Sequence, residues 1–248
     1  MDLVTSQPTT RAASREQASH KHEAKETADV AARSRPGLKY VVEAIGTFVL
    51  VFTVGAAVAS HSPLAPLAIG ASLMVMVYAG GHVSGGHYNP AVTLAVLVRG
   101  RIGPREAAAY WITQIGAGLL AAVTVRAVID PLQITHIAAI TLTGRTLLAA
   151  FVVEFLFTFA LCYVVLNVAT SKDHPDNSFY GLAIGFTVAA GAIAVGGISG
   201  GAFNPAVTIA GAAMDIFAWP TLWVYLLAQV IAGVAAGVTF LTLNPNDK

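Results

Sequence analysis

The sequence predicts an all-α membrane protein with six transmembrane helices and two re-entrant half-helices in an inverted repeat. Three observations lead to this prediction: the composition, a set of long apolar stretches, and a ten-residue phrase that occurs twice. Of the 248 residues, 56% are hydrophobic and 11% are charged, and the mean hydropathy is +0.69. Because soluble domains carry about 25% charged residues, this composition favours an integral membrane protein.

Six apolar stretches reach or approach the roughly 20 residues needed to cross the hydrocarbon of a bilayer. They are residues 40–59, 63–80, 106–127, 147–169, 180–195 and 219–241. Two further apolar runs, residues 89–98 and 204–214, are about half as long. At about 1.5 Å of rise per residue, a helix in either run would cross only half of the membrane.

The basic residues predict the orientation of these spans. Twelve of the 14 lysines and arginines lie before the first span, between the second and third, between the fourth and fifth, or after the sixth. Only Arg126 and Arg145 lie on the other side. Because cytoplasmic segments carry the excess of basic residues, we expect both termini in the cytoplasm. The plasma membrane is the expected location.

The repeated phrase links the two halves of the chain. It reads SGGHYNPAVT from Ser84 and SGGAFNPAVT from Ser199, so eight of ten positions agree at an offset of 115 residues. Gln114 and Gln229 are separated by the same offset. Each half holds three spans, and because three is odd, the second half enters the membrane upside down. Inverted repeats of this kind place a shared site near the bilayer midplane.

The Asn-Pro pairs in the phrase predict the starts of two short helices. Asparagine is a preferred N-cap, and proline is favoured at the first helical position. Asn89-Pro90 and Asn204-Pro205 therefore begin the half-helices, and the glycines before them form irregular backbone. Such backbone is tolerated at membrane depth only when it is buried in protein or lines a watery cavity. The positive helix ends and the asparagine amides would then point into one lumen.

The paired Asn-Pro-Ala sequences, Asn89-Pro90-Ala91 and Asn204-Pro205-Ala206, resemble those of the aquaporin, or major intrinsic protein, family. The resemblance covers residues 38–242 and implies a channel domain with repeats at about 40–127 and 147–241. Residues 1–37 are polar and are predicted to form a disordered cytoplasmic tail, and residues 243–248 a second cytoplasmic tail.

The resemblance also implies a passive flow of water through one pore per protomer of a homotetramer in the lipid bilayer. Asn89 and Asn204 are expected to donate to a passing water, and the carbonyls of residues 84–88 and 199–203 to form a ladder of acceptors. The positive helix ends oppose cations. It implies no enzyme activity, cofactor, metal or nucleic-acid partner, and the sequence contains no Ser–His, paired-Asp or HExxH arrangement.

Several polar residues near the motifs have more than one interpretation. Carboxylates are costly inside a membrane, so Glu43 and Glu154 are either proton-relay groups or, as in the family, acceptors of backbone N–H bonds that support the re-entrant loops. Gln114 and Gln229 either face the pore or support the loops. His82 and His87 are either pH-dependent gates or packing residues, and His87 is assigned to loop support.

The family's selectivity filter corresponds to Ile69, Ala192, Gly201 and Val207. Many members carry an arginine where this chain has Val207, and a similar valine occurs in some vacuolar members. The filter therefore has no arginine, histidine or aromatic side chain. We expect it to be wide and apolar, and to pass water with glycerol, urea, ammonia and hydrogen peroxide as candidate further solutes. The aspartate that glycerol-facilitating members carry after the second motif is absent.

A secondary transporter of a small neutral solute would also use inverted repeats and broken helices, and it is the main alternative. The cysteine that often makes the family sensitive to mercury corresponds to Gly201, which leaves Cys162 as the one thiol in the chain. We therefore expect weak inhibition by mercury.

Overall fold

The computed structural model describes residues 37–129 and 139–247, so the predicted tail lies outside the described residues except for Gly37. Within this part, six helices are long and apolar enough to cross a membrane, which confirms the predicted spans. They are α2 (Leu38–Ala59), α3 (Ala65–Ser84), α5 (Pro104–Val128), α7 (Arg145–Thr170), α8 (Tyr180–Ser199) and α10 (Leu222–Leu243), the last preceded by the 3-10 turn η1 (Trp219–Thr221).

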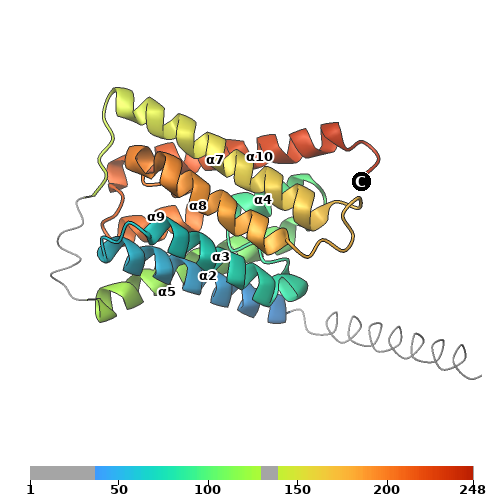
Figure 1. The fold of residues 1–248 in the computed structure, drawn as a ribbon, viewed down its shortest axis with the longest axis horizontal. Helices are drawn as coiled ribbons and strands as arrows, with labels where there is room; N and C mark the ends of the chain where they lie inside the picture. Colours follow the sequence, from blue (N-terminus) through green and yellow to red (C-terminus); the bar gives the residue numbers. More distant parts are fainter. Residues whose placement is uncertain (1–36, 130–138, 248) are drawn as a thin grey trace, which may run out of the picture. The chain divides into compact units, whose positions relative to one another are not determined.

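Two short helices lie among the long ones, as the sequence predicts (Figure 1). These are α4 (Pro90–Val98) and α9 (Pro205–Ala213), with nine residues each. At about 1.5 Å per residue, each is roughly 14 Å long, half of a bilayer's hydrocarbon core. The half-helix α4 packs against α5, α7 and α10, whereas α9 packs against α5 and α10.

The helices α3 and α8 are longer than the sequence predicts. The predicted spans 63–80 and 180–195 stop before the glycine-rich phrases, but the helices continue to the serine of each phrase. Gly85 and Gly200 then end them as left-handed C-caps, with φ of 88° and 87°. Glycine adopts this backbone without the penalty that a Cβ brings. A prediction from apolar content alone therefore places the C-terminal ends of these two helices four residues too early.

Close helix contacts depend on glycines that face another helix. A Cβ on Gly233 of α10 would lie 2.7 Å from the carbonyl oxygen of Ala91 in α4. A Cβ on Gly185 of α8 would lie 2.4 Å from the carbonyl oxygen of Gly70 in α3. Small residues at such contacts let backbones approach closely, which is how membrane helices gain packing energy.

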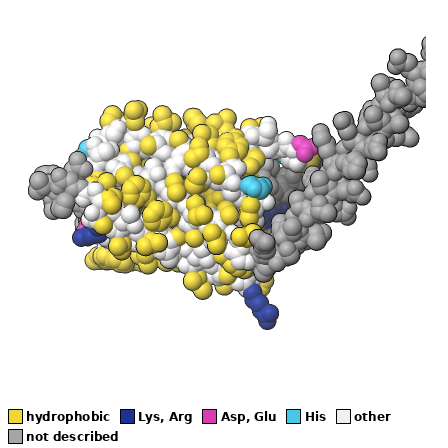
Figure 2. Space-filling model, turned by 90° about the horizontal axis from the view of Figure 1, so that it is seen from below, with side chains coloured by type: hydrophobic (Ala, Val, Ile, Leu, Met, Phe, Trp, Pro, Cys, Tyr) yellow, Lys and Arg dark blue, Asp and Glu magenta, His cyan; other side chains and the backbone are white. Residues whose placement is uncertain are grey.

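The outer surface suits a lipid environment. Figure 2 shows one face of the molecule with hydrophobic side chains spread across it and charged side chains near its ends. Large apolar side chains stand out from the helices, among them Ile112 (74% exposed), Ile193 (69%) and Leu148 (68%). Burial of such side chains in the acyl chains of a bilayer removes them from water.

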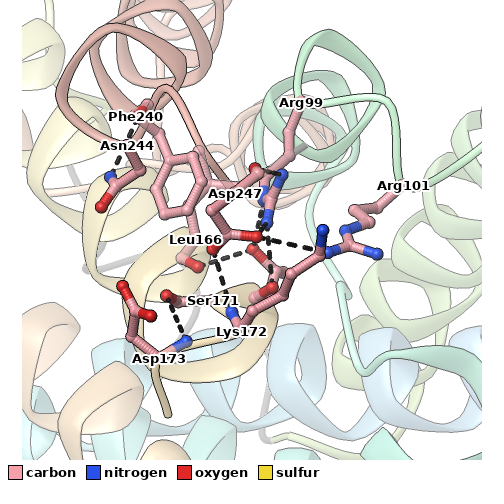
Figure 3. A network of polar contacts seen from close by, with 10 residues as sticks. Arg99, Arg101, Leu166, Ser171, Lys172, Asp173, Phe240, Asn244 and Asp247 are labelled. Carbon is pink, nitrogen blue, oxygen red and sulfur yellow. Dashed lines mark hydrogen bonds and ion pairs between the residues drawn. The ribbon is translucent and has the colours of Figure 1, made fainter. Parts of the chain in front are cut away.

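A buried ion pair joins the end of α4 to the C-terminal segment (Figure 3). Arg99 donates from Nη2 to Asp247 Oδ1 and from Nη1 to the Asp247 carbonyl, each at 2.8 Å. Its Nε donates to Thr170 Oγ1 at 2.8 Å, and its guanidinium lies 4.3 Å from the centre of the Phe240 ring. In the sequence, Arg99 is recognisable only as one of the cytoplasmic charges, and no local pattern predicts its contact with Asp247.

Replacement of Asp247 by alanine should lower the thermal stability of the protein by several degrees, because Arg99 would be left buried without its counter-charge. The measurement is a melting curve of the detergent-solubilised protein. Asp215→Asn is the matched control, since Asp215 pairs with Arg126 at the end of α9 but both side chains are about half exposed. The structural interpretation is wrong if the two variants melt alike.

The contribution of the Arg99–Asp247 ion pair to stability should persist at mildly acidic pH. Burial would raise the pKa of Asp247, but the Lys172 amide and the Arg99 guanidinium outweigh this and lower the pKa from 3.8 to about 2. A lowered folded-state pKa gives stability that is complete above the ordinary pKa of 3.8 and is lost as the pH falls to about 2. The difference in melting temperature between the wild type and Asp247→Ala should therefore persist at pH 4.

Candidate functional site

Two re-entrant loops connect α3 to α4 and α8 to α9, and both turn through left-handed backbone. Glycine adopts positive φ freely, whereas tyrosine or phenylalanine does so at a cost of about 1–3 kcal/mol. The structure must therefore offset this cost elsewhere. The residues with positive φ are Gly85 (88°), Gly86 (63°) and Tyr88 (47°) in the first loop, and Gly200 (87°), Gly201 (68°) and Phe203 (48°) in the second.

Glu43 of α2 accepts four hydrogen bonds beneath the first loop. Its Oε1 accepts from Ser84 Oγ at 2.8 Å and from the His87 amide at 2.9 Å. Its Oε2 accepts from the Tyr88 amide at 2.7 Å and from Gln114 Nε2 at 2.8 Å. The carboxylate is fully buried, and these bonds satisfy loop amides that have no water to bond in a membrane.

Glu154 of α7 makes the same four contacts in the second half. Its Oε1 accepts from Ser199 Oγ at 2.7 Å and from the Ala202 amide at 2.9 Å. Its Oε2 accepts from the Phe203 amide at 2.8 Å and from Gln229 Nε2 at 2.9 Å. The one strained non-glycine residue in each loop is therefore bonded directly to a glutamate. This contact offsets part of its backbone cost.

The two glutamines complete the support of each loop. Gln114 Nε2 also donates to Thr93 Oγ1 of α4 at 3.0 Å, and Gln229 Nε2 donates to Thr208 Oγ1 of α9 at 2.9 Å. Both glutamines are fully buried, and neither lines the central cavity. Their geometry matches the loop-support interpretation rather than the pore-facing one.

The two asparagines cap the half-helices. Asn89 Oδ1 accepts from the Ala91 amide at 2.8 Å, and Asn204 Oδ1 accepts from the Ala206 amide at 2.9 Å. Both residues have extended backbone, with φ of −156° and −155°. These side chains are thus fixed by the N-terminal turns that they cap, which directs each amide nitrogen away from its own helix.

The amide nitrogens bridge the two halves of the chain. Asn89 Nδ2 donates to the Phe203 carbonyl, and Asn204 Nδ2 donates to the Tyr88 carbonyl, both at 2.9 Å. Each asparagine therefore bonds the residue that precedes the other asparagine. The half-helices meet end to end, as the inverted repeat predicts, and this reciprocal pair of bonds holds them together. A carboxamide has two N–H donors, so each nitrogen keeps one more.

A cavity of about 60 Å³ lies against this junction, with room for a short row of water molecules. The polar side chains in its wall belong to His87, Asn89 and Asn204, and the rest of the wall is aliphatic, aromatic or glycine. The lining residues are Leu50, Val54, Val58, Ile69, Leu73, Gly86, His87, Asn89, Val92, Leu161, Val165, Ile184, Val188, Ala192, Gly200, Gly201, Ala202, Asn204, Val207, Ile216 and Phe217.

The four predicted filter residues all line this cavity. Ile69 comes from α3, Ala192 from α8, Gly201 from the second loop and Val207 from α9. The structure therefore brings together residues from four separate segments. None of the four side chains carries a hydrogen-bonding group, so solutes that pass them meet only apolar side chains and backbone.

Fewer backbone carbonyls are free to accept than the ten that were predicted to form a ladder in residues 84–88 and 199–203. Its first member in each loop accepts from a tyrosine: Tyr110 Oη donates to the Ser84 carbonyl at 2.7 Å, and Tyr225 Oη donates to the Ser199 carbonyl at 2.8 Å. Its last member accepts from the opposite asparagine. Among the described residues, only the three middle carbonyls of each loop lack a protein donor. Neither tyrosine was predicted to contact a loop, although the offset of 115 residues relates Tyr110 to Tyr225.

The remaining candidate residues occupy different environments. His87 lines the cavity, with Nδ1 at 3.1 Å from Thr93 Oγ1 and its ring centre 5.2 Å from that of Tyr110. His82 is exposed on α3 and does not line the cavity. Cys162 is fully buried in α7 and is also outside the lining. His87 is thus the only one of the three that borders the lumen.

Comparisons with known proteins agree with this geometry. The chain is 39% identical to glycerol uptake facilitator protein-like 6 of Lactiplantibacillus plantarum over 84% of this chain and 99% of that protein. It is 34% identical to nodulin-26 of Glycine max, over 85% of this chain and 79% of that protein. It is also 34% identical to aquaporin NIP1-2 of Arabidopsis thaliana, over 85% and 75%.

A solved structure shares the fold. The aquaglyceroporin of Plasmodium falciparum superimposes with a TM-score of 0.70 at 21% identity, over 82% of this chain and 94% of that one. The family model of the major intrinsic proteins matches residues 33–240. Together with the reciprocal asparagine bonds and the two re-entrant half-helices, this match shows that the chain belongs to the major intrinsic protein family.

Proposed function

We propose that the central cavity conducts water together with small neutral solutes, with glycerol and urea as the first to test and ammonia and hydrogen peroxide as further candidates. The chain is a passive channel of its family, not an enzyme, and a secondary transporter is not favoured. The observation that carries the proposal is the pair of asparagine amides that meet at one cavity, beside four apolar filter residues.

The asparagine pair would orient the water at the centre of the pore. Each Nδ2 uses one N–H for the opposite loop, which leaves the second for a passing water oxygen. Two donors at one point allow that water to donate only outward, toward the free loop carbonyls. This arrangement interrupts a continuous proton wire, and the positive ends of α4 and α9 raise the energy of a cation there.

The filter would set the range of solutes. Val207 stands where many family members have an arginine, so the filter lacks both the bulk and the charge of that side chain. A neutral solute larger than water meets less obstruction there, and apolar walls suit the CH groups of a polyol. The similarity to a protein named as a glycerol uptake facilitator supports glycerol as a candidate.

Glu43 and Glu154 would act as loop supports rather than as a proton relay. Each makes four hydrogen bonds to one loop and its supporting glutamine. Neither carboxylate lines the central cavity. His87 would fix the first half-helix through Thr93 while its ring borders the lumen.

The protein is a multi-pass membrane protein, and we propose the plasma membrane as its location, with both termini in the cytoplasm. The excess of basic residues on one side supports this orientation. A homotetramer with one pore per protomer is the proposed assembly, because the exposed apolar surface offers faces for helix packing.

Substitution of Val207 by arginine should abolish glycerol and urea flux and spare water, because the longer, charged side chain would narrow the filter. Stopped-flow light scattering on proteoliposomes, with sucrose, glycerol and urea gradients, measures all three permeabilities. Val207→Ile is the control, since it keeps an uncharged aliphatic side chain. If the wild type passes neither glycerol nor urea, the proposed solute range is wrong.

Glu154→Gln should reduce folding stability by about 2 kcal/mol or more, because an NH₂ group would face loop donors that now have an acceptor. Water permeability per correctly folded molecule should stay near the wild-type value. Melting curves and quantified proteoliposomes measure the two effects. Glu106→Gln is the control, because the Glu106 side chain is 34% exposed in its ion pair with Lys39. Complete loss of transport in stable, well-inserted Glu154→Gln protein would contradict the support role.

Mercury should inhibit the channel weakly, because Cys162 is fully buried and lies outside the cavity lining. Water flux measured before and after brief exposure to mercuric chloride tests this. Ala192→Cys provides the positive control, since it places a thiol in the lining, and should be blocked. Strong, rapid block of a Cys162→Ser variant would overturn the prediction.

A further inference from the structure

The lining of the cavity includes a phenyl side chain that belongs to none of the four filter positions. Phe217, four residues after the end of α9, lines the cavity together with its neighbour Ile216. It is only 2% exposed, so its ring is part of the protein wall. The equivalent residue of the first repeat, 115 positions earlier, is Ile102, which is outside the lining.

The ring of Phe217 occupies a slot made by two glycines. A Cβ on Gly200 would lie 2.7 Å from the Phe217 ring, and a Cβ on Gly211 would lie 2.5 Å from it. Gly211 lies inside α9, where glycine weakens a helix by about 1 kcal/mol relative to alanine. The first half-helix has Val96 at the matching position. The slot therefore exists only in the second repeat.

Further contacts fix Phe217 beside the filter. Its ring centre lies 4.9 Å from that of Tyr225, whose hydroxyl holds the Ser199 carbonyl of the second loop. The adjacent backbone pairs with Ile140: the Ile140 amide donates to the carbonyl of the residue before Phe217 at 2.9 Å. The Ala218 amide donates to the Ile140 carbonyl at 3.2 Å. The side chain is thus anchored to the same loop that supplies Gly201.

We propose that Phe217 is a further specificity-determining residue, which limits the size of the solutes that enter this filter. The lumen measures about 60 Å³, less than half of the roughly 150 Å³ of a cavity that binds benzene, so loss of a phenyl ring from its wall would enlarge it substantially. The four filter side chains are small or aliphatic. The Phe217 ring therefore supplies steric bulk beside a filter whose four positions hold neither an arginine nor an aromatic residue. This inference rests on the proposed conduction of small neutral solutes.

Phe217→Ala and Phe217→Leu test the proposal in proteoliposomes by stopped-flow light scattering. The ratio of glycerol to water permeability should rise at least threefold in the alanine variant and less in the leucine variant. The four-carbon polyol erythritol should pass the alanine variant faster than the wild type. Ile102→Ala is the matched control, because it removes the equivalent side chain outside the cavity, and its ratio should equal that of the wild type.

The outcomes separate this inference from the proposed function. An unchanged glycerol-to-water ratio in either Phe217 variant, in protein that inserts normally, overturns the role of Phe217. If the wild type passes only water but Phe217→Ala admits glycerol, the proposed solute range fails and the role of Phe217 stands. If the alanine variant does not fold, the leucine variant decides, because it keeps most of the buried apolar volume.

Discussion

The structure depends on how the amides of two irregular loops are satisfied inside a membrane. A loop amide at this depth has no water to bond, and an unsatisfied one costs several kcal/mol. Glu43 and Glu154 each accept the same four hydrogen bonds, two of them from loop amides. Because the buried carboxylates accept from both loop amides and glutamine side chains, their own burial is compensated too. The half-helices that follow the loops can then begin at mid-membrane.

The loops in turn place the asparagines. Each Asn side chain is held by the cap of its own helix and by the carbonyl that precedes the opposite asparagine. Neither half can supply this geometry alone, since each donor needs an acceptor from the other repeat. The lumen is therefore a property of the paired repeats. A change that tilts either half-helix would disturb both asparagines at once.

Much of this arrangement could be predicted from the sequence, because a duplicated motif with an odd number of spans per half permits one inverted geometry. The ends of α3 and α8 were missed, since apolar content does not show that a helix continues through Gly81 or Gly196 to its cap. Tyr110 and Tyr225 were missed although their offset of 115 residues was visible. The pairing of Arg99 with Asp247 joins residues 148 positions apart, and no local pattern indicates it.

The differences between the repeats identify where selectivity can arise. The glutamate and glutamine supports, the asparagine caps and the bonds between the two loops are matched in both halves. These features therefore do not distinguish one end of the pore from the other. The lining positions that differ between the repeats include His87 against Ala202, Phe217 against Ile102, Ile216 against Arg101 and Ala192 against Val77. The second is accompanied by Gly211 in place of Val96, which makes room for the ring. Because Gly211 and Phe217 pack against each other, these two departures from symmetry together place a phenyl ring in the wall of the lumen.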